Sequence, residues 1–186
     1  MLIGLLWVLK IAPIFSAKWI WKADTLPRIK TFLWMCAHNN IGVNVCLEKR
    51  GVVLEIICPI CQGRLKTVLH AFRGCPQIKQ VWNQLDIMSS NQAFWRNNLQ
   101  DWLSSNGREN CSLVAANPPW KIVFLFAVWN IWKSKNKFVF SRKNRNPNLA
   151  VEIVNQATEF IHCVSSPSLQ TCKVIKRICW ERPPQS

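Results

Sequence analysis

Three cysteines and one histidine lie close together in the chain, and they are its residues best suited to chemistry. Thiolate and imidazole are good zinc ligands, and four of them in a tetrahedron fill the coordination sphere of the ion. Two cysteines separated by two residues can present both sulfurs to one ion from a single turn. The pattern Cys-x2-Cys-x8-His-x4-Cys therefore predicts a structural zinc site that leaves no position for water or substrate. Its expected ligands are Cys58, Cys61, His70 and Cys75.

Two alternatives to zinc stay open for these residues. Cys58 and Cys61 could be ordinary buried cysteines, with His70 as a polar residue of the core. A thiol oxidoreductase could use the Cys-Pro-Ile-Cys motif of residues 58–61, but that motif belongs in a thioredoxin-like βαβ setting, which the sequence does not predict. A second group lacks any usual ligand spacing, and we expect no metal there: His162, Cys163, Cys172 and Cys179.

The elements around the four ligands are predicted to be short helices with one extended approach. Residues 26–39 carry apolar side chains at helical spacing, and Gly51 is expected to end a second, shorter helix. Residues 52–61 have the composition of a strand that leads to the first cysteine pair. An amphipathic helix is predicted after the last cysteine, from an apolar stripe at helical spacing formed by Ile78, Val81, Trp82 and Leu85.

The second half of the chain is also predicted to be helical. A helix around Phe94, Leu99 and Trp102 is expected to pass into a polar linker at residues 104–112. A long helix over residues 120–138 and an amphipathic helix over residues 151–164 follow. The apolar run of the long helix is much shorter than the ~20 residues that cross a bilayer, so we expect a buried helix and no membrane anchor.

The charge of the chain is strongly unbalanced, with 24 Lys and Arg against 9 Asp and Glu and a net charge of +15. Such a surplus favours a polyanionic partner, with nucleic acid first, although a piece cut from a better balanced protein would also show it. Residues 121–146 contain seven basic residues and no acid, which predicts phosphate contacts with RNA or DNA. The seven are Lys121, Lys133, Lys135, Lys137, Arg142, Lys143 and Arg145.

Several functions are disfavoured by what the sequence lacks. The nine acids are scattered singly, and the chain has no tyrosine, which argues against a polymerase palm or a two-metal nuclease. We therefore expect no catalysis and no small-molecule substrate. Lys10 interrupts the apolar N-terminal run and no basic stretch precedes it, so a secretory signal is not expected. A nuclear or cytoplasmic location is favoured over secretion.

The spacing of aromatic, basic and ligand residues resembles one known family. It is similar to the zinc-binding domain that follows the polymerase in plant LINE-type (non-LTR) retrotransposon reverse transcriptases. The resemblance is carried first by Trp21, Pro27, Lys30, Phe32, Trp34, His38, Asn39, Leu47, Arg50 and Gly51, and then by the four ligands with Thr67, Phe72 and Trp82. A looser match to the helix before an RNase H-like domain involves Trp129, Trp132, Asn136, Lys137 and Phe140.

The departures from the family pattern spare the ligands. Lys66 stands in place of a glutamate, Lys135 in place of an arginine, and Gly42-Val43-Asn44 in place of Leu-Pro-Thr. A retroviral zinc knuckle has four residues between its second cysteine and its histidine, whereas this chain has eight, so it is a different module.

The resemblance implies a mainly α fold, in which a small helical domain held together by a structural zinc ion is followed by linker helices. Residues 1–18 would be an apolar segment unlike the family, residues 19–88 the zinc-binding domain, residues 89–119 a helix with a polar linker, residues 120–164 a helical basic region, and residues 165–186 a tail before an RNase H-like domain.

The implied function is a non-catalytic structural-zinc domain, derived from a retrotransposon, that binds RNA or DNA. One alternative is a protein–protein docking module for polymerase or RNase H-like domains of the parent element. A degenerate fragment without function is the other.

Overall fold

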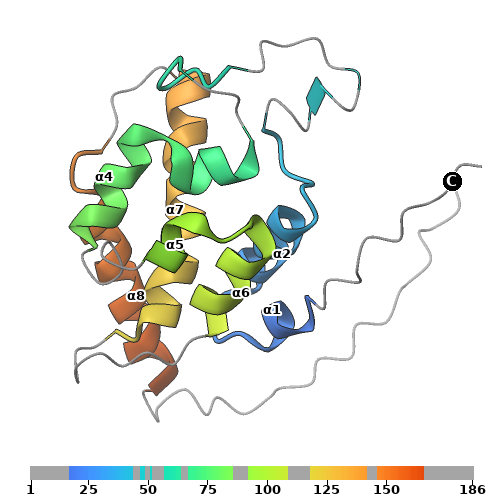
Figure 1. Cartoon of the computed structure of the whole chain (residues 1–186). Helices are drawn as coiled ribbons and strands as arrows, with labels where there is room; N and C mark the ends of the chain where they lie inside the picture. Colours follow the sequence, from blue (N-terminus) through green and yellow to red (C-terminus); the bar gives the residue numbers. More distant parts are fainter. Residues whose placement is uncertain are drawn as a thin grey trace, which may run out of the picture.

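The computed structural model describes residues 17–43, 47–48, 51, 57–63, 67–85, 92–108, 118–141 and 146–165. The elements in these ranges are helices, apart from a single β-bridge residue at Ile57 (Figure 1). They are α1 (Lys18–Lys22), α2 (Pro27–Ala37), the π-helix η1 (His70–Gly74), α4 (Pro76–Gln84), α5 (Gln92–Arg96), α6 (Leu99–Arg108), α7 (Trp120–Ser141) and α8 (Leu149–Ser165). The predicted mainly α fold class is confirmed.

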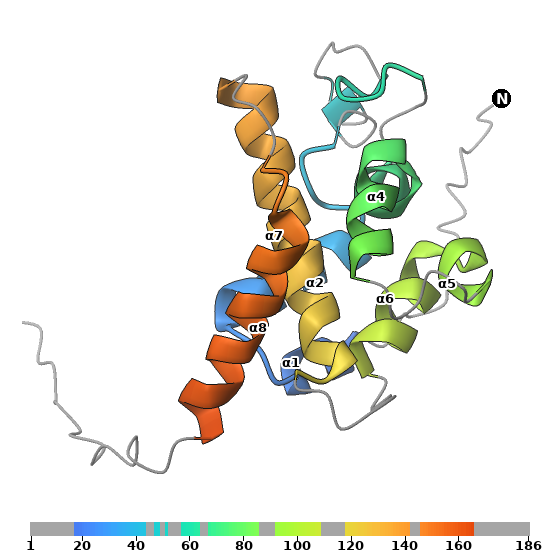
Figure 2. The same ribbon diagram turned by 90° about the vertical axis from the view of Figure 1, so that its left-hand side faces the viewer.

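The long helix α7 occupies the centre of the fold. It contacts α2, η1, α6 and α8, and α8 lies against it in both views (Figures 1 and 2). Its N-terminal half is buried on nearly all sides, including Phe124, Leu125 and Val128. A helix that is apolar all round must be covered by other elements, which explains why this one became the centre. The predicted long helix over residues 120–138 is confirmed and extends to Ser141.

Helical turns in the first half end at residues in the left-handed conformation. Asn39, two residues after the end of α2, has a φ of 52°, and its N–H donates to the carbonyl of Cys36 over 3.0 Å. Gly51 has a φ of 81°, and its N–H donates to the carbonyl of Glu48 over 2.9 Å. Asparagine and glycine tolerate this conformation best, so both residues stop a helix and turn the chain.

The structure corrects the prediction of one helix followed by a polar linker in residues 92–108. Two helices are present, because the side chain of Asn98 accepts a hydrogen bond from the N–H of Asp101 and caps the start of α6. The polar residues 104–108 then continue α6 to Arg108. They are held in the helix by Asn106, which is buried and accepts a hydrogen bond from Trp120 Nε1 over 3.1 Å.

An aromatic cluster joins α4, α5, α6 and α7. Trp82 stacks on Phe124 with ring centroids 5.8 Å apart, and Trp102 meets Phe94 and Phe124 edge to face. Such pairs add to the stabilisation that comes from burying the rings. The predicted stripe on α4 is confirmed, since Ile78, Val81, Trp82 and Leu85 are all buried.

Several predicted segments lie outside the described residues. They are residues 1–16 of the N-terminal segment, residues 52–56 of the strand-like approach, residues 109–117 of the linker and residues 166–186 of the tail. Among the helices that the structure describes, none has the length and apolar character needed to cross a bilayer.

Candidate metal centre and basic surface

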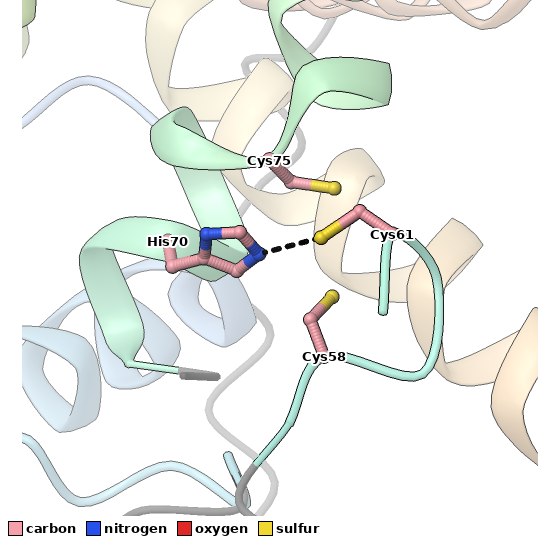
Figure 3. Close-up of side chains that lie close together, drawn as sticks. All are labelled: Cys58, Cys61, His70 and Cys75. Carbon is pink, nitrogen blue, oxygen red and sulfur yellow. Dashed lines mark hydrogen bonds between the residues drawn. The ribbon is translucent and has the colours of Figure 1, made fainter. Parts of the chain in front are cut away.

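The four predicted ligands meet at one point, between a turn and the helix η1 (Figure 3). We call Cys58, Cys61, His70 and Cys75 the CCHC cluster. Their ligand atoms all lie within 4.8 Å of one another. Two sulfurs bound tetrahedrally to one zinc ion at about 2.3 Å are about 3.8 Å apart, so the cluster needs only a small contraction to hold the ion. The donor set and its geometry therefore fit zinc.

A tight turn presents the first two ligands. The N–H of Gln62 donates to the carbonyl of Cys58 over 2.8 Å, and Gln62 adopts a φ of 53°. This conformation reverses the chain directly behind Cys61, so both sulfurs point to the same side. The side chain of Gln77 on α4 donates to the carbonyl of Ile60 over 3.4 Å and connects the turn to the helices.

The π-helix η1 brings the other two ligands together. Residues five apart in an α-helix point about 140° away from each other, because each residue turns the helix by about 100°. The wider turn of η1, closed by a 3.0 Å hydrogen bond from the N–H of Cys75 to the carbonyl of His70, brings both side chains to one face. Thr67 supports its start, since the hydroxyl oxygen accepts a 3.0 Å hydrogen bond from the N–H of His70.

Pro76 leaves two carbonyls of η1 without backbone partners. The carbonyls of Ala71 and Phe72 would receive the N–H of residue 76 in a π- or an α-helical pattern, and proline has none. Side chains take its place: Lys135 Nζ donates to the Ala71 carbonyl and Trp82 Nε1 to the Phe72 carbonyl, each over 2.7 Å. The sequence thus shapes η1 through one proline and two distant donors.

The CCHC cluster is poised to hold a thiolate. The Sγ of Cys61 lies 3.3 Å from His70 Nε2, so this ring nitrogen points into the cluster. A hydrogen bond from the Cys75 thiol lowers the pKa of Cys58 to about 2, against the effect of burial and with help from His70 and backbone groups. The pKa of Cys75 is raised because its thiol donates this hydrogen bond and because it is buried.

Three basic residues lie between the first and the last ligand in the sequence: Arg64, Lys66 and Arg73. Arg64 and Lys66 lie outside the described residues. Arg73 is buried and points elsewhere: its guanidinium donates to the carbonyls of Phe94 and Asn97, each over 2.7 Å, and lies 5.6 Å from the ring centre of Trp102. Arg73 therefore attaches α5 and the segment after it to η1.

The predicted phosphate-binding residues occupy different environments. Lys133 and Lys137 are exposed on α7, whereas Lys121 pairs with Asp24 at 3.4 Å. Lys135 is 2% exposed, so the structure does not support the prediction that it contacts phosphate. Its spacing from Ile131, one turn earlier on the apolar face, was the signal that could have shown this. The other three predicted residues lie outside the described ranges: Arg142, Lys143 and Arg145.

An open groove between α7 and the start of α8 was not predicted. It has a volume of about 770 Å³ and is lined on α7 by Trp129, Trp132, Lys133 and Lys137 among others, and on the other side by residues 146–152. We call it the α7–α8 groove. Sequence spacing places these four residues on one helical face, but the position of α8 opposite them could not be predicted.

The second cysteine and histidine group is not brought together within the described part of the chain. His162 and Cys163 lie near the end of α8, where Cys163 is exposed, and Cys172 and Cys179 lie outside the described residues. Among the residues that the structure describes, the CCHC cluster is the one group of three or more potential ligands.

Comparison with known proteins identifies relatives of the chain. Residues 8–82 match the family model described as zinc-binding in reverse transcriptase, and this range contains the whole CCHC cluster. A protein of Arabidopsis thaliana named "Putative ribonuclease H protein At1g65750" is 26% identical over 128 residues, which are 68% of this chain and 20% of that protein. The chain thus spans about a fifth of the length of this relative. No solved structure matches this chain significantly.

Proposed function

We propose that the CCHC cluster holds one structural Zn²⁺ ion, because residues 8–82, which contain it, match the family model described as zinc-binding in reverse transcriptase. The observation that carries this proposal is the approach of all four ligand atoms to within 4.8 Å of one another. Three sulfurs and one imidazole nitrogen complete a tetrahedron, so no position is left for a substrate. The ion then joins the turn of residues 58–62 to η1 and supports the fold without catalysis.

Metal analysis of ligand variants tests this assignment. The wild-type chain is expected to contain one zinc ion, and Cys58→Ser and His70→Ala are expected to lose most of it because three ligands hold the ion poorly. Cys163→Ser and His162→Ala are matched controls, since they remove the same side chains from α8, and they should keep one ion per chain. Mass spectrometry of the metal measures the content. A wild-type chain that takes up no zinc on refolding would contradict the proposal.

We further propose that the α7–α8 groove binds single-stranded RNA or DNA. Lys133 and Lys137 are exposed on α7, one turn apart, and both line the groove. Their ammonium groups can contact successive phosphates. The rings of Trp129 and Trp132 pack against Phe32 on their inner side and line the groove with their outer parts, on which unpaired bases can stack. The net charge of +15 adds a long-range attraction for any polyanion.

A charge reversal at the groove tests the nucleic-acid proposal. Lys133→Glu with Lys137→Glu is expected to weaken binding of a labelled 20-nucleotide single strand at least tenfold. It should also reduce the slope of log affinity against log salt by about 1.4, for two lost phosphate contacts. Fluorescence anisotropy at several salt concentrations measures both quantities.

A matched control uses Lys18 and Lys22, which are exposed on α1 with the same spacing. Lys18→Glu with Lys22→Glu changes the net charge equally and should weaken binding much less. Equal losses in the two double variants would mean that only the overall charge matters, and the groove would then have no special role.

A docking surface for polymerase or RNase H-like domains is the second candidate. Apolar side chains are exposed near the ends of α7 and α8, with Phe140 83% and Val164 67% exposed. Apolar docking does not depend on counterion release, so its affinity should stay nearly constant as salt rises, whereas nucleic-acid binding weakens steeply.

A further inference from the structure

Lys135 lies on the inner side of α7, unlike the lysines two residues before and after it. It exposes 2% of its surface, and its Nζ donates a 2.7 Å hydrogen bond to the carbonyl of Ala71, between the ligands His70 and Cys75 in sequence. Taking an ammonium group out of water is costly unless an opposite charge or strong acceptors compensate for it. A nearby negative charge would therefore add to the stabilisation that the Ala71 carbonyl gives this buried ammonium group.

The CCHC cluster would carry such a negative charge once zinc is bound. Zn²⁺ with three thiolates and a neutral imidazole has a net charge of −1. Cys58 and Cys75 are fully buried, His70 is 7% exposed and Cys61 is partly exposed, so water can screen only part of this charge. The carbonyl of Ala71, which holds the Lys135 ammonium group, directly follows the ligand His70 in the chain, so this positive charge lies next to the cluster.

We propose that Lys135 is the outer-sphere cation of the zinc site, compensating the net negative charge on the ion and its three thiolates. The inference rests on the proposed zinc assignment. Lys135 is a positioning residue: it binds no metal, and its ammonium group is placed to offset the negative charge of the zinc-loaded cluster. Its hydrogen bond to Ala71 fixes where that charge lies. The centre of the fold is thereby coupled to the metal site, because α7 supplies the cation while η1 and its C-cap residue Cys75 supply two ligands.

Three substitutions at this position separate charge from packing. Lys135→Met removes the charge and the hydrogen bond at similar volume, Lys135→Gln keeps a hydrogen-bond donor without charge, and Lys135→Arg keeps the charge. Lys133→Met and Lys137→Met are controls, because they remove the same charge from exposed positions of the same helix. Competition with a chromophoric chelator measures zinc affinity, and the rate of alkylation of the zinc-loaded protein by iodoacetamide measures the reactivity of its thiolates.

The expected result is a zinc affinity at least tenfold lower in the Met and Gln variants than in the two controls, with the Arg variant within about threefold of wild type. Faster alkylation of the zinc-loaded Met and Gln variants should accompany it, because an uncompensated negative charge raises the nucleophilicity of bound thiolates. The second measurement does not require a folded zinc-free state.

Two outcomes would overturn the inference. One is a Gln variant that matches wild type in affinity and alkylation rate, because the hydrogen bond would then be sufficient. The other is a Met variant that matches the Lys133 and Lys137 controls, because the buried charge would then be irrelevant to the metal. Either leaves the zinc assignment intact if wild type still binds one ion, whereas a wild-type chain without zinc would refute the assignment itself.

Discussion

Gly107 and Trp19 show how little free space the residues of this core have. A Cβ atom added at Gly107 on α6 would lie 2.5 Å from Cζ3 and 2.6 Å from Cη2 of Trp19, closer than real Cβ contacts. Trp19 is buried, so its ring has little room to move. The absence of a side chain at residue 107 therefore allows α1 to pack directly on α6.

Gly107→Ala is expected to destabilise the protein despite the better helix propensity of alanine. Overpacking costs about 1–3 kcal/mol, whereas the gain in propensity is about 1 kcal/mol, so the free energy of unfolding should fall by about 1 kcal/mol. Urea denaturation measures it. Ser105→Ala on the exposed face of α6 is the control and should stay within about 0.5 kcal/mol of wild type. A more stable Gly107→Ala variant would show that the Trp19 ring can move aside.

The four residues proposed as metal ligands are the ones whose grouping in space the sequence predicts best. Spacing alone grouped Cys58 with Cys61, and the histidine and third cysteine completed a set that one ion accepts. Lys135 was misassigned because counting basic residues over a range ignores the face on which each one lies. Its burial depends on η1 packing against α7, a contact between residues 64 positions apart in the chain.

At the scale of elements, the sequence predicted helices well and their ends and types less well. The apolar stripes of α2, α4, α7 and α8 showed where helices form. Residues 104–108 were misassigned because their polar composition is typical of a linker. The contact of Asn106 with Trp120 that keeps them in the helix is tertiary, so the local sequence does not show it. The π-helix η1 was not predicted either. Pro76 was its visible signal, but the donors that satisfy the Ala71 and Phe72 carbonyls come from other helices.

At the scale of the whole molecule, the described residues share one hydrophobic cluster, which runs from Ala17 to Ala157 and includes Cys58 and Cys75. The predicted zinc-binding segment and the helices after it therefore share one core. Loss of the metal should be felt beyond the segment that holds it, because α7 contacts η1 on one side and α8 on another.

Zinc removal is expected to lower the stability of all the helices together. Chelation should shift thermal unfolding to lower temperature as one transition, because an ion present at 1,000 times its dissociation constant contributes about 4 kcal/mol. Circular dichroism at 222 nm follows the loss, and excess zinc should restore it. If α7 and α8 melted in a separate transition unaffected by the chelator, the shared core would not couple them to the metal.

The spacing of three lysines along α7 connects two surfaces of the molecule, the one at the CCHC cluster and the one in the α7–α8 groove. Lys135 points inward to the Ala71 carbonyl, while Lys133 and Lys137 on either side line the α7–α8 groove. One residue inserted after Ser134 would rotate everything beyond it by about 100°. Lys135 would leave the metal site, and Lys137 would leave the groove in the same step. Over this stretch, substitutions are thus easier to accommodate than a change in the length of the helix.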